Sequence, residues 1–397
     1  MKKIILVSSF SESCGNAYFT EVLLHGLKSM NVDAHCASLD LALTQSVELS
    51  VRRKADKEID RICTDLSQVD AVNVQFEAGL YGTIPADIFN RFKKIASANK
   101  NTSVTLHSPR ILGNSSNYRE ALRLVLTGRV KSGLIKLIND YKNDIHVRLN
   151  RRVISFAVKR GCPLIVHTLR AKEQIKLLFD YDNVKVHPLK FVPSQRLINR
   201  EVLDNIRRQY KLSKDDKIVG VFGYLSEYKG TVAALQAIKN LPSEYKLFIF
   251  GRAHPQSVKN GESINPFLAK LNAYIANNKL SDRVFYIGEL NTDDFIDCAG
   301  SVDCVWLPYL EVGQDGSGIA SICCDVSNKI IASNSFAFDE LLKLIPYKNL
   351  LRFDIGNVIE LSQKTQFSDD LICDRNYNNL DYNLNTQAKT YLDSFNF

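Results

Sequence analysis

The sequence predicts an α/β protein with two doubly wound, Rossmann-like domains. Short apolar runs typical of buried strands alternate with amphipathic stretches typical of helices, which indicates parallel sheets covered on both faces. The alternation stops at the Pro-containing segment near residue 192 and then begins again, so we expect two sheets rather than one. A length of 397 residues also favours more than one hydrophobic core.

The first domain is expected to span residues 1–192. Its predicted strands are Ile4–Ser8, Asp33–Cys36, Ala71–Gln75, Ser103–His107, Pro163–His167 and Val184–His187. Its predicted helices include Ala17–Lys28, Lys54–Leu66, Pro85–Ala98 and Ala171–Phe179, and a basic helical insertion occupies residues 110–160. Ligands of such sheets bind at the carboxyl ends of the strands, so the residues that follow each strand are the candidates for function.

The second domain is expected to span residues 193–375. Its predicted strands are Lys217–Phe222, Lys246–Phe250, Arg283–Ile287, Asp303–Leu307 and Lys329–Ser333. Its predicted helices include Thr231–Lys239, Asn265–Asn277, Thr292–Ala299 and Phe336–Leu344. Residues 376–397 are predicted to form a tail, in which a loop precedes a last helix at Thr386–Ser394.

The composition is ordinary for a folded cytoplasmic protein, with 45% hydrophobic and 24% charged residues. No apolar run approaches the roughly 20 residues that cross a bilayer, and the apolar start at Ile4–Val7 is too short for a signal core. The nine cysteines form no C-x-x-C pair and no metal-like spacing with histidine, which predicts free, mostly buried thiols.

The net charge of +8 is concentrated in one segment. Residues Arg119–Arg160 contain eleven Lys and Arg against three acidic residues, so the remainder of the chain is close to neutral. A basic amphipathic segment can lie on an anionic membrane surface, and a pair of packed helices with solvated basic faces explains the pattern equally well. Nucleic acid is a poor candidate partner because the segment has few aromatic residues for base stacking.

Two segments of the second domain carry the strongest signals. The first runs from Val219 to Gly230: a strand ends at Gly223, and Lys229 with Gly230 opens a helix. A lysine at a helix N-terminus can hold a diphosphate, although most such lysines are solvated. The second runs from Trp306 to Gly318, where glycines before an apolar helix allow a ligand to approach the backbone. A plain strand–turn–helix link is its simpler explanation.

These segments, in this order and about 90 residues apart, resemble the retaining glycosyltransferases of the GT-B fold, the glycogen-synthase and mannosyltransferase-like group. The resemblance covers residues 1 to about 345. It includes the strand–glycine segments that end at Gly251-Arg252 and Gly288, the loop Ser9–Asn16, the element Asn73–Gly82, and the strand that ends in His107. It implies two facing Rossmann-like domains with the active site in the cleft between them.

The resemblance also implies roles for individual residues. The expected catalytic residues are His107, Lys229 and Gln314. Donor-binding residues are expected at Gly15, Asn16, Gly223, Tyr224, Lys229, Arg252, Gly288, Glu311, Asp315, Gly316, Ser317 and Gly318. Acceptor-binding residues are expected at Gln75, Glu77 and Tyr81, although the polar pair Gln75 and Glu77 also suits ordinary capping. His107 taken alone is a strand-end histidine bonded to a carbonyl, and His167 and His187 are expected to be structural.

The chain departs from the group at two places. Tyr224 stands where an arginine often follows the first glycine. Gln314 and Ile322 stand where the group commonly has two glutamates, and Glu311 is close to the first of these places but out of register. Some members with a Ser-Gly loop also lack the glutamate pair.

The sequence therefore predicts a metal-independent glycosyltransferase that needs no cofactor. It would move a hexose from a nucleoside diphosphate sugar to a glycan or lipid-linked acceptor, with retention, in surface polysaccharide synthesis. It would be cytoplasmic and could bind the inner face of the membrane. The alternatives are a non-catalytic module that binds a nucleotide sugar or supports a partner, and a sugar-nucleotide epimerase. A dinucleotide oxidoreductase is disfavoured, since no strand is followed by G-x-G-x-x-G.

Overall fold

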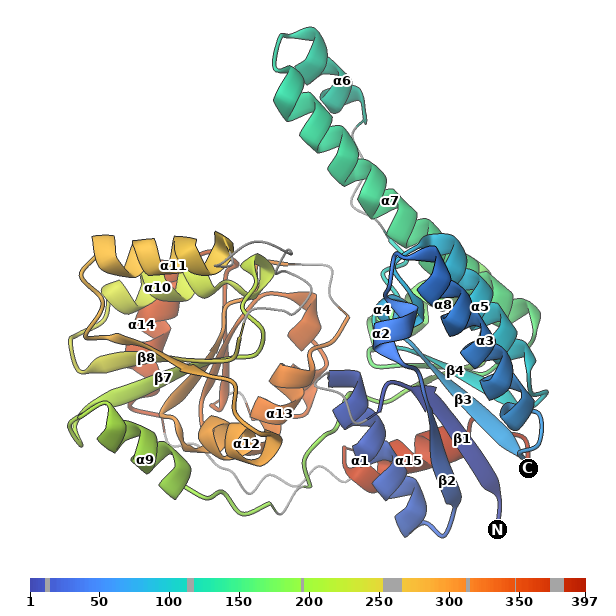
Figure 1. Cartoon of the computed structure of the whole chain (residues 1–397). Helices are drawn as coiled ribbons and strands as arrows, with labels where there is room; N and C mark the ends of the chain where they lie inside the picture. Colours follow the sequence, from blue (N-terminus) through green and yellow to red (C-terminus); the bar gives the residue numbers. More distant parts are fainter. Residues whose placement is uncertain are drawn as a thin grey trace. The chain divides into compact units, whose positions relative to one another are not determined.

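The structure is a computed structural model that describes residues 1–10, 15–112, 118–193, 196–252, 266–311, 315–346, 348–371 and 382–397. The chain forms two compact units (Figure 1): Met1–Pro188 together with Leu384–Phe397, and Leu189–Asn383. Each unit contains a six-stranded parallel sheet with flanking helices. The predicted fold class is confirmed.

The sheet of the first unit has the strand order β2-β1-β3-β4-β5-β6. Its strands are β1 (Lys3–Ser8), β2 (Asp33–Ser38), β3 (Ala71–Phe76), β4 (Thr102–Leu106), β5 (Leu164–Val166) and β6 (Val184–Val186). Its helices are α1 (Gly15–Ser29), α2 (Leu41–Thr44), α3 (Leu49–Leu66), α4 (Ala78–Tyr81), α5 (Pro85–Ser97), α6 (Tyr118–Leu126), α7 (Val130–Lys159), α8 (Leu169–Phe179) and α15 (Leu384–Leu392).

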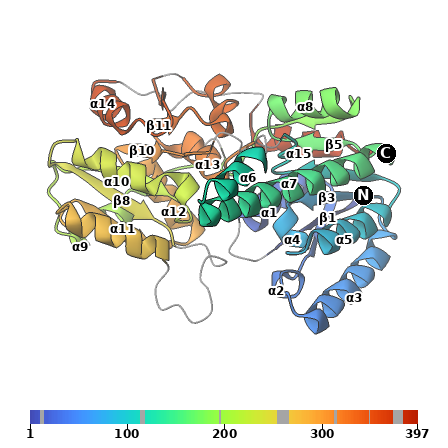
Figure 2. The ribbon, with the colours of Figure 1, turned by 90° about the horizontal axis from the view of Figure 1, so that it is seen from above.

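The two faces of this sheet differ in polarity. Val72, Val74 and Phe76 of β3 pack into an apolar core with α3, α5, α7 and α8. The alternate residues of the same strand, Asn73 and Gln75, point to the opposite face, which α1 and α15 cover (Figure 2). A buried strand face is therefore partly polar, and its amides need partners within the protein.

The last helix predicted in the C-terminal tail is present as α15, and the segment packs on the first unit, which the sequence analysis did not predict. A Cβ added at Gly26 of α1 would lie 3.2 Å from Ala388 Cβ of α15, so the two helices pack closely. Asn101 bonds the backbone of Asn396 in both directions at 3.0 Å. Leu384–Phe397 thus belongs to the first unit, because α15 completes the cover of its sheet. The change of unit falls after Pro188, where the sequence analysis set it after residue 192.

The sheet of the second unit has the strand order β12-β11-β10-β7-β8-β9. Its strands are β7 (Lys217–Phe222), β8 (Tyr245–Phe250), β9 (Val284–Gly288), β10 (Cys304–Leu307), β11 (Ile330–Ser333) and β12 (Leu350–Phe353). Its helices are α9 (Glu201–Gln209), α10 (Thr231–Lys239), α11 (Pro266–Asn277), α12 (Thr292–Ser301), α13 (Gly318–Val326) and α14 (Val358–Ser368). The order reverses between β7 and β10, and ligands of open α/β sheets bind at such a point.

Three elements of this unit were not predicted, namely α9, β12 and α14. The predicted helix Phe336–Leu344 is also wrong. The segment forms two 3₁₀ turns, Phe336–Phe338 and Leu341–Lys343. Arg352 of β12 donates to the Ser335 carbonyl at 3.0 Å and pairs with Asp339 at 3.4 Å, the two residues that flank the first turn. No helix in the described ranges is long and apolar enough to cross a membrane.

Candidate functional site

The loop after β7 is forced against the end of β10. Gly230 has φ +72°, and a Cβ at this position would lie 1.7 Å from the Pro308 carbonyl oxygen. A side chain cannot fit there, so glycine is required both by the space and by the backbone conformation. This close approach brings Lys229, at the end of the short 3₁₀ turn Glu227–Lys229, next to the residues that follow β10.

Lys229 is held by a tyrosine that the sequence analysis did not single out. Its Nζ donates to Tyr309 Oη at 2.9 Å and lies 4.8 Å from the centre of that ring. Tyr309 Oη lies 2.9 Å from Ser317 Oγ, which in turn accepts from the Ala320 amide at 3.2 Å and caps α13. A chain of hydrogen bonds therefore links Lys229 to the N-terminus of α13. This chain lies at the carboxyl ends of the neighbouring strands β7 and β10.

Lys229 is only 8% exposed, whereas most lysines at a helix N-terminus are solvated. Burial lowers its pKa below the usual range for lysine. Among the residues that the structure describes, no carboxylate forms an ion pair with it. Cys323 lies nearby, but burial raises the pKa of that thiol to about 12, so the thiol supplies no negative charge. A buried cation without an anion is costly, and an anionic ligand would relieve that cost.

The Gly/Ser loop lies beside this lysine. Asp315 and Ser317 are buried, while Glu311 and Gly316 are half-buried. Gln314 lies outside the described residues. A Cβ added at Gly318 would lie 3.1 Å from the ring of Phe191, so that ring already fills the space beside the glycine. The small residue at 318 is thus explained by packing, where the sequence suggested close approach of a ligand.

The remaining predicted donor residues lie near strand ends of their own sheets. Gly223 has φ +101°, and its Cβ would lie 3.2 Å from Lys229 Nζ. Tyr224 is half-buried, and exposed Arg252 pairs with Glu289 at 3.1 Å beside Gly288, which has φ +88° and open space around it. In the first unit, Gly15 is exposed at the start of α1, and the Asn16 carbonyl accepts from the Thr20 hydroxyl at 2.7 Å.

His107 follows β4 and is buried in a chain of hydrogen bonds. Its Nε2 lies 2.7 Å from the Gln75 amide, and its Nδ1 lies 3.2 Å from His167 Nε2. His167 Nδ1 donates to the His187 carbonyl at 2.9 Å, because a carbonyl can only accept. His167, expected to be structural, thus lies between His107 and the His187 carbonyl in this chain of contacts.

The Gln75 side chain is the second partner of that ring. Burial, followed by the nearby His167, lowers the pKa of His107 well below its usual range, which favours the neutral ring. An amide oxygen can only accept, so His107 Nε2 donates to Gln75 Oε1. The Gln75 NH₂ group donates to Asn73 Oδ1, and the Asn73 NH₂ group donates to the hydroxyls of Ser103 and Thr105 of β4. Both ring nitrogens of His107 are therefore engaged within the first unit.

Two of the three predicted acceptor residues are out of reach of an acceptor. Gln75 and Tyr81 are fully buried, and the Tyr81 hydroxyl donates to the Gln75 carbonyl at 3.0 Å. Gln75 orients His107 and Tyr81 braces the same strand, because both side chains turn inward from β3 and α4. Glu77 is half-buried. Burial raises its pKa, against the opposing effects of Arg110 and a hydrogen bond to Ser108.

The described residues contain no group of three or more His, Cys, Asp or Glu side chains placed to hold a metal ion. The seven cysteines in the described ranges are free thiols. Metal independence remains a prediction.

The Phe191 contact predicts a specific coupling. Gly318→Ala should lower the free energy of unfolding by about 1–2 kcal/mol, because the new methyl group displaces a buried ring. In a Phe191→Leu background the same change should cost less, since the ring atoms that it meets are gone. Urea unfolding of the two single variants and the double variant measures this. Gly15→Ala, at a helix start with open space, is the control. Additive losses would contradict the packing role.

His167 should make stability depend on pH. Its pKa is lowered by burial to about 4, against about 6.5 when unfolded, so the unfolded chain binds an extra proton between these values. The free energy of unfolding should therefore fall as the pH is lowered from about 6.5 to 4, by about 1.4 kcal/mol per pKa unit. His167→Gln should flatten this dependence in urea titrations, and His35→Gln, on the surface, should not. An equal pH dependence in wild type and His167→Gln would overturn this assignment.

One family model matches part of the second unit. Residues 203–322 match the family model described as Glycosyl transferases group 1. The comparison with curated proteins gives no match. Among solved structures, Anabaena Alr3699/HepE in complex with UDP-glucose has a TM-score of 0.62 at 12% identity, covering 99% of this chain and 100% of its own.

Two further structures cover both units. Sucrose-phosphate synthase from Thermosynechococcus elongatus has a TM-score of 0.64 at 13% identity, covering 100% of this chain and 95% of its own. WaaG, a glycosyltransferase involved in lipopolysaccharide biosynthesis, has a TM-score of 0.58 at 10% identity, covering 98% and 95%. At such identities the likeness shows the fold. The chain therefore has the GT-B fold over its whole length, and its residues 203–322 match the model of the glycosyl transferases group 1 family.

Proposed function

We propose that this chain transfers a hexose from a nucleoside diphosphate sugar to a hydroxyl group of a glycan or lipid-linked acceptor, with retention, in surface polysaccharide synthesis. The observation that carries the proposal is the buried Lys229, which pairs with no carboxylate of the described residues and is linked through Tyr309 and Ser317 to the N-terminus of α13. The HepE complex with UDP-glucose supports a UDP-sugar as donor, and WaaG supports a role in surface glycans.

The residues at the carboxyl ends of β7 and β10 suit the departure of a diphosphate. The Lys229 ammonium and the positive end of the α13 dipole would stabilise the charge that develops on the leaving oxygens. Tyr309 would keep the ammonium aimed, since its hydroxyl fixes Nζ at 2.9 Å. Such fixed groups need no rearrangement during the reaction, and they would serve in place of a metal ion.

A non-catalytic nucleotide-sugar module is the second candidate. Ile322, at one of the places where the group has a glutamate, is buried and apolar on α13. It offers no charge to a reacting sugar, which favours a variant mechanism or lost activity. A third candidate, a sugar-nucleotide epimerase, would convert the donor when no acceptor is present. Product analysis with and without acceptor separates all three.

A thermal-shift panel tests the donor class. UDP-glucose and UDP-galactose should raise the melting temperature more than GDP-mannose or dTDP-glucose, because a ligand that binds only the folded state stabilises it by about 2.7 kcal/mol at 100 times its Kd. If none of the sugars shifts the melting temperature at millimolar concentration, the proposed donor site is wrong.

Lys229→Met tests the role of the buried cation. We expect turnover to fall by about 100- to 1,000-fold, as for loss of one preorganised charge-stabilising donor. Stability should be unchanged or raised, because methionine fills the same space without a desolvated charge. The rate is measured as release of the nucleoside diphosphate, and the fold by urea unfolding.

The matched control is Lys239→Met on α10, an exposed lysine that bonds Asn278. This variant should keep wild-type turnover. Near wild-type activity in Lys229→Met would remove this lysine from the mechanism.

A further inference from the structure

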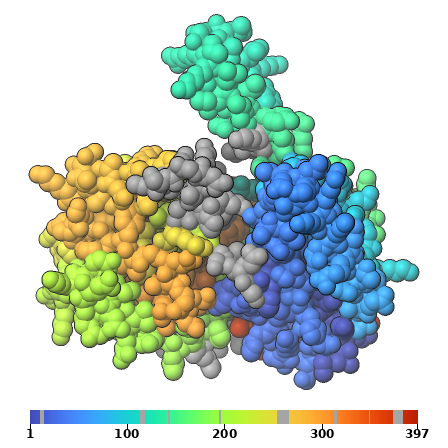
Figure 3. Space-filling view, in the orientation of Figure 1, coloured from blue at the N-terminus to red at the C-terminus, as the bar shows by residue number. Residues whose placement is uncertain are grey.

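Helices α6 and α7 form a hairpin between β4 and β5 that contributes little to the core of the first unit. From Leu149 onward α7 joins that core, while residues 118–148, here called the hairpin, extend away from it (Figure 3). The two helices meet through small residues: a Cβ at Gly133 would lie 2.5 Å from Val125 Cγ2 and 2.8 Å from the Ala121 carbonyl. Close packing of this kind leaves the large side chains on the outside.

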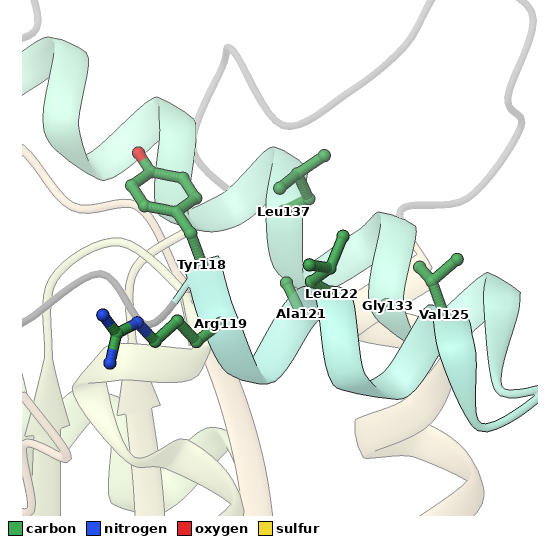
Figure 4. Close-up of a pocket in the computed structure, with 7 residues that line it drawn as sticks. All are labelled: Tyr118, Arg119, Ala121, Leu122, Val125, Gly133 and Leu137. Carbon is green, nitrogen blue, oxygen red and sulfur yellow. The ribbon is translucent and has the colours of Figure 1, made fainter.

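The outside of the hairpin is strongly apolar. Seven of its large apolar side chains are between 42% and 78% exposed, namely Leu122, Leu126, Val130, Leu134, Ile135, Leu137 and Ile138. A groove of about 320 Å³ runs along α6 and α7, with Tyr118, Leu122, Val125 and Leu137 on its walls (Figure 4). Contiguous apolar surface of this extent on a folded protein marks a binding surface.

Cations surround this surface without anions to neutralise them. Arg119, Arg123, Arg129 and Lys131 are exposed, and none of the four forms an ion pair with a described residue. The acidic residues of the hairpin already form ion pairs or hydrogen bonds within it. Lys136 pairs with Glu120 at 3.3 Å and with Asp140 at 3.6 Å, and the Tyr118 hydroxyl bonds Asp144. The free charge of the hairpin is therefore positive.

We propose that the tip of the hairpin, residues 122–135, docks on an anionic lipid bilayer. Leu126 and Val130 flank the turn at Gly128 and would enter the interface between headgroups and acyl chains. Arg123, Arg129 and Lys131 would meet the headgroup phosphates, because apolar insertion and basic attraction act together in such segments. A second copy of the chain is a poorer occupant, since two identical cationic surfaces repel each other.

This inference rests on the proposed function in one respect only: lipid binding would bring the enzyme to a lipid-linked acceptor. Lipid binding itself requires no donor, no acceptor and no turnover. The residues of the tip are also separate from Lys229 and from the Gly/Ser loop. Variants of the tip should therefore keep the thermal shift that UDP-sugars produce, and failure of either proposal can be recognised without the other.

Co-sedimentation of the full chain with vesicles tests the proposal. We expect binding to vesicles of phosphatidylcholine with phosphatidylglycerol, no binding to phosphatidylcholine alone, and steep loss of binding as salt rises past physiological strength. Arg123→Gln/Arg129→Gln/Lys131→Gln should weaken binding by about fivefold for each charge removed. Leu126→Ser/Val130→Ser should remove the apolar part of the binding. The binding that remains in the wild type at high salt, where the charges are screened, should therefore be lost in this variant.

Matched controls come from the same unit. Leu177→Ser removes a leucine of α8 that is 84% exposed, and Lys54→Gln/Lys57→Gln removes exposed charges of α3. Both should bind vesicles as the wild type does. Wild-type binding by the tip variants, or weakening by the controls to the same degree, would overturn the assignment of the tip.

Tryptophan fluorescence gives a second readout. The natural Trp306 is fully buried in the second unit, so a tryptophan placed at the tip reports on its own surroundings. Leu126→Trp should shift its emission to the blue and resist quenching by iodide when anionic vesicles are added, and Leu177→Trp should do neither. An unshifted Leu126→Trp spectrum would overturn insertion. A wild-type dimer that Leu126→Ser/Val130→Ser dissolves would instead make the hairpin an interface between copies.

Discussion

The second unit is organised around one constraint: the Lys229 ammonium group is buried, and no carboxylate of the described part of the chain pairs with it. Gly230 makes this possible, because only the absence of a Cβ lets the β7 loop pass the Pro308 carbonyl. Tyr309 then compensates part of the lost hydration with one hydrogen bond to Nζ. Burial lowers the pKa of Lys229, and a bound diphosphate would raise it again. Binding of an anionic ligand beside Lys229 would therefore offset the cost of burying its charge.

In the first unit, by contrast, the buried polar side chains of β3 form hydrogen bonds with other groups of the same unit. Asn73 and Gln75 lie on a buried face of β3, where unpaired amides would cost several kcal/mol. Their partners come from β4, from His107 and, through Thr105, from Tyr391 of α15. One fixed tautomer of His107 follows from this network. A ligand that needs a ring nitrogen of His107 must therefore displace Gln75, whereas a ligand of Lys229 displaces no such partner.

The spacing of apolar residues along the chain predicted the strands and helices that this spacing determines. Thr231–Lys239 and Lys217–Phe222 were predicted to the residue, and Lys229-Gly230, predicted to open a helix, directly precede α10. Contacts between distant residues were missed, because spacing along the chain contains no signal for them. Tyr309 with Lys229, Phe191 with Gly318, and α15 with α1 are of this kind. Gln75 and Tyr81 were misjudged for a related reason: their polarity was visible, but the face of β3 on which Gln75 lies was not.

Positive charge serves two different physical purposes in this chain. Lys229 acts at short range in a buried site, where the dielectric is low and salt screens little. The exposed cations of the hairpin act over a distance near the Debye length, about 8 Å at physiological ionic strength, and their effect falls as salt rises. The excess charge of the sequence is gathered at Arg119–Arg160, while the rest of the chain is close to neutral. Raised salt should therefore separate the two: association with an anionic surface is lost first, and the site at Lys229 continues to bind its ligand.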